Sequence, residues 1–380
     1  MKTTYLLLCL LGIGSVSGAG QTKQPQKIGD FIESTSYNEH RRNATRSLQY
    51  TPDGDDFVCI NGKNRFTRAL YGSHTAFRLE TSDRPVFAAY TKENPKHICF
   101  KLQTSGGTVA LDSTEHCESR YTAGRRSYSL SDPAFGGGSL SITTWALPDK
   151  EGAIWQFNAR NFKEFHPVLL ASISEIRNSK LNRNGDMGAD PADSFEAPLQ
   201  PQQLQSFPVQ IDGTLYILLE NQELRTLTTA EGENLFKKAE AARSKTASRI
   251  RIETPDPYFN TLGGTLAMAA DGIWDGEVWL HGAIGWRMPL SGWRAAYTGD
   301  VLGWHDRART HFNAYAASQV TEVPNTLPHP AQDSALHLAR SVKKWGTPQY
   351  SNGYICRNPH RNNQMHHLSL IHISEPTRPE

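Results

Sequence analysis

Three carboxylates and two indoles lie close together in the stretch Asp271-Gly-Ile-Trp-Asp-Gly-Glu-Val-Trp279. Cleavage of a glycosidic bond needs one carboxylic acid that stays protonated in apolar surroundings and a second carboxylate that acts as base or nucleophile. Indole rings provide such surroundings, and they also stack on the C–H faces of sugars. Asp271, Asp275 and Glu277 are therefore candidate catalytic residues, with helix capping and loop hydrogen bonds as the structural alternative for each of them.

A second stretch, Gly285–Thr310, carries more planar and charged side chains than a core helix requires. Three Trp, four Arg and two Asp occur in it, interrupted by Gly and Pro. Guanidinium groups offer a fork of donors that suits hydroxyls, and carboxylates accept hydrogen bonds from pairs of sugar hydroxyls. We predict a concave carbohydrate-binding site in which these side chains contact the substrate: Trp286, Arg287, Trp293, Arg294, Tyr297, Asp300, Trp304, His305 and Asp306.

Two structural alternatives apply to this second stretch. A network of Arg and Asp can lock loops together without binding a ligand. Asp306 also precedes a predicted helix at Arg307, so its side chain could cap that helix. No CxxC or other metal-ligand spacing occurs, and neither a metal site nor a cofactor is predicted.

The region from Asp56 to about Leu219 has the pattern of an antiparallel β-sandwich. Short runs rich in β-branched and aromatic residues follow one another at nearly regular spacing, without an intervening amphipathic helix. Asn61-Gly62 is expected to close a hairpin after the first run. The expected strands are Phe57–Ile60, Thr75–Leu79, Val86–Tyr90, His97–Leu102, Arg126–Leu130, Leu140–Leu147, Ile154–Phe157, Val168–Ile173, Phe207–Ile211 and Leu215–Leu219.

An amphipathic linker helix is predicted after the sandwich. Thr228 and Glu231 have the spacing of a capping box at its start, and Pro255 and Pro257 prevent its continuation. The apolar face of this helix consists of Leu235, Phe236, Ala239, Ala242 and Thr246.

The chain changes character after Pro257. Helical periodicity appears in Phe259–Ile273, Arg307–Gln319 and Asp333–Lys344, and loops rich in Trp, Gly and Arg separate these segments. Helices joined by aromatic loops favour an α-helical toroid with its site at one end. In the second of these helices the residues expected to face inward are Phe312, Tyr315 and Ala316.

At these residues the chain resembles the six-hairpin (α/α)6-toroid glycosidases. The motif consists of Pro289-Leu-Ser-Gly-Trp-Arg294, then Tyr297, then Gly303-Trp-His-Asp306. Thr254-Pro-Asp-Pro257 is similar to the entry into the toroid in members with an N-terminal β-sandwich. The likeness covers about Asp56–His367 and is nearest to uncharacterised exported glycan-degrading proteins of this architecture.

The resemblance implies an activity and a division of roles. Arg294, Trp304 and Asp306 would hold the sugar at the subsite of cleavage, while later hairpins would carry the catalytic acid and base of related inverting members. Leu368–Arg378 looks like a translated sequencing adapter, so the natural chain is expected to continue past His367. The chain given is then expected to be inactive, with a poorly folded C-terminal third (residues 255–367).

These inferences predict a multidomain, exported glycoside hydrolase acting on a complex polysaccharide or glycan. A non-catalytic glycan-binding protein is the alternative, as is a polysaccharide lyase or phosphorylase on the same scaffold. The expected boundaries are a signal peptide (1–19), a leader (20–55), the sandwich (56–227), the linker helix (228–252), the first part of the toroid (253–367) and an artefactual tail (368–380).

Composition restricts the partners further. The formal net charge is +2 in 380 residues, which gives no electrostatic reason to expect nucleic acid or an anionic membrane as partner. The N-terminal apolar run, Tyr5–Ile13, is too short to span a bilayer, and a periplasmic or secreted location is expected. The four later cysteines are scattered, which favours free, buried thiols over a disulfide scaffold.

Overall fold

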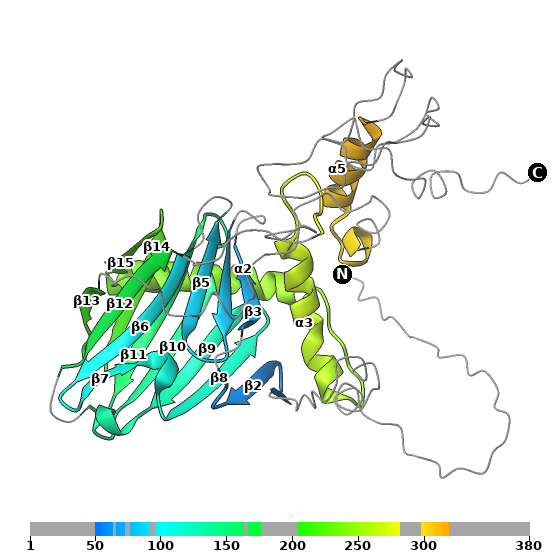
Figure 1. Cartoon of the computed structure of the whole chain (residues 1–380). Coiled ribbons are helices and arrows are strands. Elements are labelled where there is room, and N and C mark those ends of the chain that lie inside the picture. Colours follow the sequence, from blue (N-terminus) through cyan, green and yellow to red (C-terminus); the bar gives the residue numbers. More distant parts are fainter. Residues whose placement is uncertain are drawn as a thin grey trace, which may run out of the picture. The chain divides into compact units, whose positions relative to one another are not determined.

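An antiparallel β-sandwich followed by a few helices makes up the computed structural model (Figure 1), which confirms the predicted fold class at this level. All described residues belong to one compact unit that begins at Leu48. The structure describes residues 50–63, 66–72, 77–91, 96–162, 166–175, 204–281 and 298–318.

Two antiparallel sheets form the sandwich. The eight-stranded sheet contains, in spatial order, β1 (Thr51–Asp53), β2 (Asp56–Ile60), β8 (His116–Thr122), β9 (Arg125–Ser131), β10 (Ser139–Ala146), β11 (Gly152–Arg160), β14 (Thr214–Glu220) and β15 (Glu223–Leu227). The seven-stranded sheet contains β13 (Leu204–Pro208), β12 (Val168–Glu175), β6 (Lys96–Thr104), β5 (Val86–Thr91), β4 (Phe77–Ser82) and β3 (Phe66–Tyr71), and β7 (Gly107–Ala110) pairs with β6.

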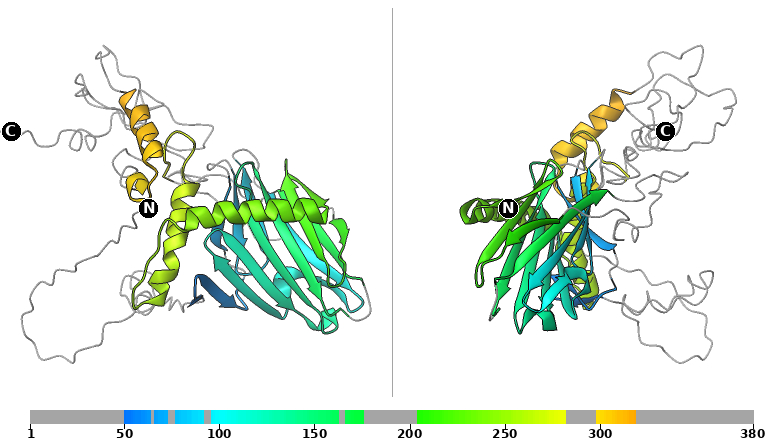
Figure 2. Two further views of the ribbon diagram at one scale, coloured as in Figure 1. Left: turned by 180° about the vertical axis from the view of Figure 1, so that it is seen from behind. Right: turned by 60° about the vertical axis from the view of Figure 1, so that its left-hand side comes forward.

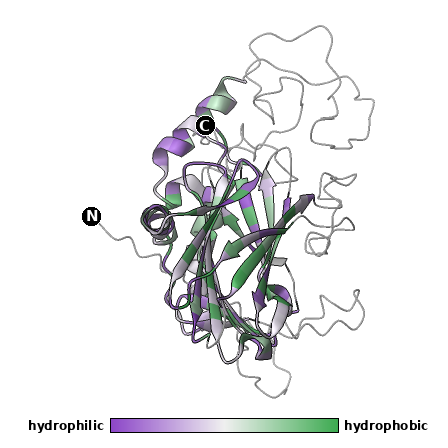
Figure 3. Cartoon of the chain, turned by 90° about the vertical axis from the view of Figure 1, so that its left-hand side faces the viewer, coloured by the Kyte–Doolittle hydropathy of each residue, from purple (hydrophilic) through white to green (hydrophobic). Residues whose placement is uncertain are grey.

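An aromatic cluster fills the space between the sheets. Trp155 of β11 is fully buried, and its ring makes edge contacts with Phe87 of β5 at 5.4 Å and Phe100 of β6 at 5.7 Å. Alternate residues of each strand point into this core because successive side chains of a strand face opposite ways. Figure 3 views the sheets from the side and shows the apolar stretches along their strands.

The predicted hairpin at Asn61-Gly62 is wrong. Strand β2 pairs with β1 and β8, whereas β3 belongs to the other sheet, so the chain crosses between sheets at this turn. The side-chain oxygen of Asn61 accepts a hydrogen bond from the backbone N–H of Cys117 at 2.8 Å, which ties the turn to β8. Asn61 also takes the left-handed conformation, with φ of 49°. The turn residues were read correctly, but their strand partner was not.

Several strands escaped the sequence analysis. The expected strand Phe207–Ile211 is shifted, since β13 spans Leu204–Pro208. Strands β1, β3, β7, β8 and β15 were not expected as such. In β8 the inward side chains are Cys117, Ser119 and Tyr121, all buried, and this mixed set hides the alternation that apolar residues would show.

Helix α2 (Thr229–Ala247) packs on the outer face of the eight-stranded sheet, where Figure 2 shows it lying across the strands. The predicted capping box is confirmed, because Thr228 accepts from the backbone of Glu231 and Glu231 accepts from the backbone of Thr228. Ala239, Leu235 and Phe236 contact an apolar cluster on β10, β11 and β14. The helix is thus a third layer of this domain as well as a connection.

A hydrogen-bonded carboxylate strengthens this contact. Glu240 of α2 accepts from the indole N–H of Trp145 and from Nε of Arg243, both at 2.9 Å. Burial alone would raise the pKa of Glu240, but the hydrogen bonds from Arg243 and Trp145 outweigh it and lower that pKa. Arg243 also donates to the carbonyl of Ala123 in the β8–β9 turn at 2.9 Å. The charged face of the helix therefore contributes to its docking.

Two further helices follow. Helix α3 (Pro257–Gly272) begins with Asp256 as N-cap and Pro257 at its first position, and it packs against α2, β1 and β3. Gly264 lies so close to Ala123 that a β-carbon would come within 2.9 Å of the Ala123 side chain. Helix α5 (His305–Ala316) comes next among the described helices. None of the described helices is long and apolar enough to cross a membrane.

The inward face of α5 differs from the prediction. Tyr315 is buried as expected, whereas Phe312 and Ala316 are exposed, so their prediction is wrong. Ala308 and His311 take the inward positions, and the reason is the hydrogen bond and ring contacts that His311 makes.

Cys59, Cys99 and Cys117 are free thiols, and Cys59 and Cys117 are buried. Burial raises the pKa of the Cys117 thiol to about 12, so this group stays protonated at neutral pH. Cys9 and Cys356 lie outside the described residues.

We expect Gly232→Ala to destabilise the protein, although alanine is the better helix former by about 1 kcal/mol. A β-carbon at this position of α2 would come within 2.2–2.7 Å of Cγ, Cδ2 and Cβ of Tyr216, atoms that cannot swing away because they lie next to the β14 backbone. Such overpacking typically costs about 1–3 kcal/mol. Urea unfolding should show the loss, while Glu233→Ala on the exposed side of the helix should change stability by less than about 0.5 kcal/mol. Equal or higher stability of Gly232→Ala would contradict this contact.

Candidate functional site

A short hairpin after α3 carries the three candidate catalytic carboxylates. The bridge between Trp274 and Trp279 closes it, and the backbone N–H of Asp275 donates to the carbonyl of Val278 at 3.1 Å. Oδ1 of Asp275 accepts from the backbone N–H groups of Glu277 at 2.9 Å and Val278 at 2.7 Å. Asp275 therefore holds the turn together. This is the structural alternative to a catalytic role that the sequence left open for this residue.

Three buried tryptophans form the centre of this region. The rings of Trp274 and Trp279 lie 4.6 Å apart, and those of Trp279 and Trp304 lie 6.4 Å apart. Leu302 and Ala308 complete the cluster. Trp274 and Trp279 belong to the hairpin and Trp304 to the start of α5, so the packed rings hold these two segments together.

Two arginines lie over the Trp304 ring. The Arg307 guanidinium is 4.5 Å from the centre of Trp304 and 5.6 Å from that of Trp274, and it donates to Oδ1 of Asp271 at 2.7 Å. The Arg249 guanidinium lies 4.9 Å from Trp304 and donates to the carbonyl of Leu302. Asp271 is thus engaged in an ion pair, and Trp304, only 8% exposed, has a packing role. Sugar contact by Trp304 stays a prediction.

His311 joins α5 to the hairpin. Its Nδ1 accepts from the backbone N–H of Trp279 at 3.2 Å, and its ring lies 4.8 Å from that of Tyr315. The proton of the neutral ring is then on Nε2, which is buried and has no hydrogen-bond partner among the described residues. Burial lowers the pKa of His311 to about 4, against a small opposing effect of Asp275.

The solvent-exposed members of the predicted set lie around the start of α5. Nδ1 of His305 is 3.0 Å from Oδ1 of Asp300, and Arg309 donates to Asp306 at 3.2 Å. Their side chains are largely exposed, from 66% for Asp300 to 94% for Asp306. Asp306 does not cap the helix, because Trp304 is the N-cap residue and no side-chain cap bond is present. Glu277 is exposed too.

The structure brings only part of the predicted set together. Asp271 and Trp304 meet through Arg307, while Asp275 serves its own turn. The remaining predicted contacts, Trp286, Arg287, Trp293, Arg294 and Tyr297, lie outside the described residues. Within the part of the chain that the structure describes, no group of three His, Cys, Asp or Glu side chains could hold a metal ion.

Sequence reasoning missed Arg249, Arg307 and His311. The last two could have been found from spacing, because residues 304, 307, 308, 311 and 315 recur at helical intervals and so share one face of α5. Arg249 has no such signal, since it comes from the end of α2 and meets Trp304 only in the folded chain.

Arg307→Met should destabilise the contact between the hairpin and α5. The substitution keeps much of the side-chain volume but removes a charge-assisted hydrogen bond and two cation–π contacts, together worth about 2–3 kcal/mol. Six of the eight tryptophans lie between residues 274 and 345, so tryptophan fluorescence during urea unfolding reports mainly on this region. Arg309→Met, which removes an exposed ion pair, is the matched control and should cost less than about 0.5 kcal/mol. Equal effects of the two substitutions would refute the role of Arg307.

Acidification should weaken the same contact through His311. The pKa of His311 is about 4 in the folded chain and about 6.5 when unfolded, so between these values only the unfolded state takes up the proton. Stability is therefore retained above pH 6.5 and falls as the pH drops toward 4, by at most about 3 kcal/mol. His311→Asn keeps an acceptor for Trp279 without a titrating group and should flatten this dependence in urea titrations at pH 7.5 and 5. His305→Asn, at an exposed site, should leave it unchanged.

Comparison with known proteins places one match on the sandwich. A family described as a domain of unknown function, DUF4450, matches residues 95–254, less than half of the chain. The matched segment runs from the start of β6 past the end of α2 and stops before Asp271 and the tryptophan cluster. No curated protein matches the chain. The part of the chain from β6 through α2 is thus similar to a domain family of unknown function.

Proposed function

We propose that the protein is an exported glycoside hydrolase that acts on a complex polysaccharide or glycan by carboxylate acid/base catalysis. In this proposal α3 and α5 belong to an (α/α)6 toroid, and the surface around the start of α5 grips the sugar. The observation that carries the proposal is the exposure of Asp300, His305 and Asp306 beside a cluster of buried tryptophans.

The exposed groups are available to a ligand. The ion pairs Asp300–His305 and Asp306–Arg309 are solvent-exposed, and such pairs contribute at most about 1 kcal/mol. A sugar hydroxyl can replace the partner at little cost. The neighbouring tryptophan cluster is held together by ring contacts, and the Arg307–Asp271 ion pair fixes Arg307 over it. These contacts support the proposal of a preorganised site.

The roles within this site follow from these contacts. Asp306 and Arg294 would bind hydroxyls, and Trp304 would offer only the part of its indole that remains exposed. Asp275 is committed to its turn and Asp271 to Arg307, and Glu277 is the most exposed of the three candidate carboxylates. We place the catalytic acid and base on later hairpins, outside the described residues.

A non-catalytic glycan-binding protein is the second candidate. It is favoured by one observation, because two of the three candidate acids near α3 already have structural partners. Glycosidic cleavage needs two carboxylates that flank the bond, about 5–10 Å apart. A lyase or phosphorylase would bind the sugar at the same surface around the start of α5 but would catalyse a different reaction.

The test is hydrolysis of a panel of plant and host glycans, followed by reducing-end release and mass spectrometry. The assay uses the full-length protein. Asp306→Asn and Arg294→Met should each lower kcat/KM at least about 100-fold if they hold the sugar in the transition state. Asp212→Asn is the matched control, since it is also exposed and loosely paired with an arginine.

The outcomes separate the candidates. Hydrolysis that both site variants lose and the control keeps supports the hydrolase. Glycan binding that depends on Asp306 without any release of product supports the binding protein. Unchanged turnover in both site variants would exclude the proposed site.

A further inference from the structure

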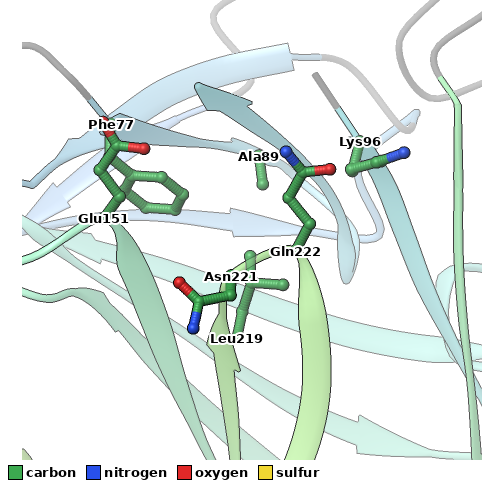
Figure 4. Close-up of a pocket in the computed structure, with 7 residues that line it drawn as sticks. All are labelled: Phe77, Ala89, Lys96, Glu151, Leu219, Asn221 and Gln222. Atoms are coloured by element: carbon green, nitrogen blue, oxygen red, sulfur yellow. The ribbon is translucent and has the colours of Figure 1, made fainter. Parts of the chain in front are cut away.

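A pocket of about 320 Å³ opens between the two sheets at one end of the sandwich, far along the chain from the tryptophan cluster (Figure 4). Strands β4, β5 and β6 of one sheet provide one wall. The other wall comes from the starts and ends of β11, β14 and β15 of the other sheet. Its lining residues are Phe77, Ala89, Lys96, Glu151, Leu219, Asn221 and Gln222.

The lining has an apolar floor and a polar rim. Phe77, Ala89 and Leu219 are buried core residues. Glu151 and Lys96 stand on opposite sides of the mouth, and the amides of the β14–β15 turn lie between them (Figure 4). Amides donate and accept hydrogen bonds at once, a carboxylate accepts and an ammonium group donates. This combination fits a ligand with hydroxyl edges and C–H faces.

The turn that supplies the amides has a backbone conformation that is unfavourable for its second residue. Glu220 pairs with Glu223, so Asn221 and Gln222 form a two-residue hairpin loop. Both have positive φ, 51° and 65°. Such a turn favours Asn-Gly, because a residue with a β-carbon is strained at the second position. A glutamine in place of glycine keeps the strain and adds an amide at the pocket, and strained residues of this kind concentrate at ligand sites.

The charges restrict the ligand further. Lys96 forms an ion pair with Glu175 at the end of β12, so its positive charge is balanced. Glu151 adds a negative charge at the mouth. An anionic ligand would therefore meet repulsion, whereas a neutral one would not. The volume is at the lower end of the range for small-molecule pockets, which suits one sugar ring rather than a chain.

We propose that this pocket binds a single neutral sugar residue, such as the end unit of a glycan, as a binding site separate from the surface around α5. Gln222, Asn221 and Glu151 bind its hydroxyls, and the apolar floor receives one C–H face. The proposal does not rest on the hydrolase activity, since it concerns the sandwich alone.

The test uses Gln222→Gly, a substitution that relieves the backbone strain of the turn and removes the side chain proposed to contact the ligand. The full chain is titrated with neutral hexoses and pentoses, and with glucuronate and inorganic phosphate as anionic probes, by saturation-transfer NMR. At least one neutral sugar should bind with a millimolar Kd, and Gln222→Gly should weaken it about tenfold through the loss of its hydrogen bonds. Thermal unfolding of Gln222→Gly should occur at the same or a higher temperature, because glycine relieves the positive φ.

Two further variants make the result decisive. Asn161→Gly relieves another exposed residue at positive φ, 61°, outside the pocket and should leave sugar binding unchanged. Asp306→Asn changes the surface around α5 and should likewise leave it unchanged, which separates this pocket from the proposed hydrolase site. The proposal is overturned if no neutral sugar binds, if an anionic probe binds more tightly, or if Gln222→Gly binds as the unmodified chain does. It is also overturned if only Asp306→Asn removes binding.

Discussion

The Arg307 guanidinium is the group on which the arrangement beyond the sandwich depends. It pairs with Asp271 at the end of α3, lies over Trp274 in the hairpin and over Trp304 at the start of α5. One planar cation thus joins two segments that are far apart in sequence, residues 271–279 and the helix α5 to which it belongs. Because arginine is weakly hydrated and stacks on indoles, it can hold this position in a partly buried site where a lysine ammonium could not. Asp306, the exposed carboxylate of α5, is the residue before Arg307 in the chain.

A second constraint links this arrangement to the sandwich. Helix α2 docks on the eight-stranded sheet through its apolar face and through Glu240, which accepts from Trp145 of that sheet. Arg249, just beyond the end of the same helix, reaches Trp304 and the carbonyl of Leu302. The position of the tryptophan cluster is therefore coupled to the sheet surface through one helix.

Local patterns in the sequence predicted local structure well, and their failures have a common cause. The capping box of α2 and the helix after Pro257 depend on neighbours within four residues, and both are present. The Asn61 turn was misassigned because its partner, Cys117, lies 56 residues away. The inward face of α5 was misjudged because His311, a polar residue, is held inside by the backbone of Trp279. A local sequence pattern does not show which residue far away in the sequence a side chain will contact.

The same distinction applies to the candidate residues themselves. Clustering of Trp, Arg and Asp predicted a site, yet in the described part the buried tryptophans form a hydrophobic cluster, and Asp271 and Asp275 have structural partners. A cluster of aromatic and charged residues in the sequence can therefore indicate either a functional site or a packed core. Exposure separates the two, because only a side chain that solvent reaches can meet a ligand without rearrangement. By that criterion Asp306 in α5 and Gln222 at the end of the sandwich are the positions where ligand binding has physical support. A second argument applies at Gln222, because its positive φ is unfavourable for a residue with a side chain, and such strained residues concentrate at ligand sites.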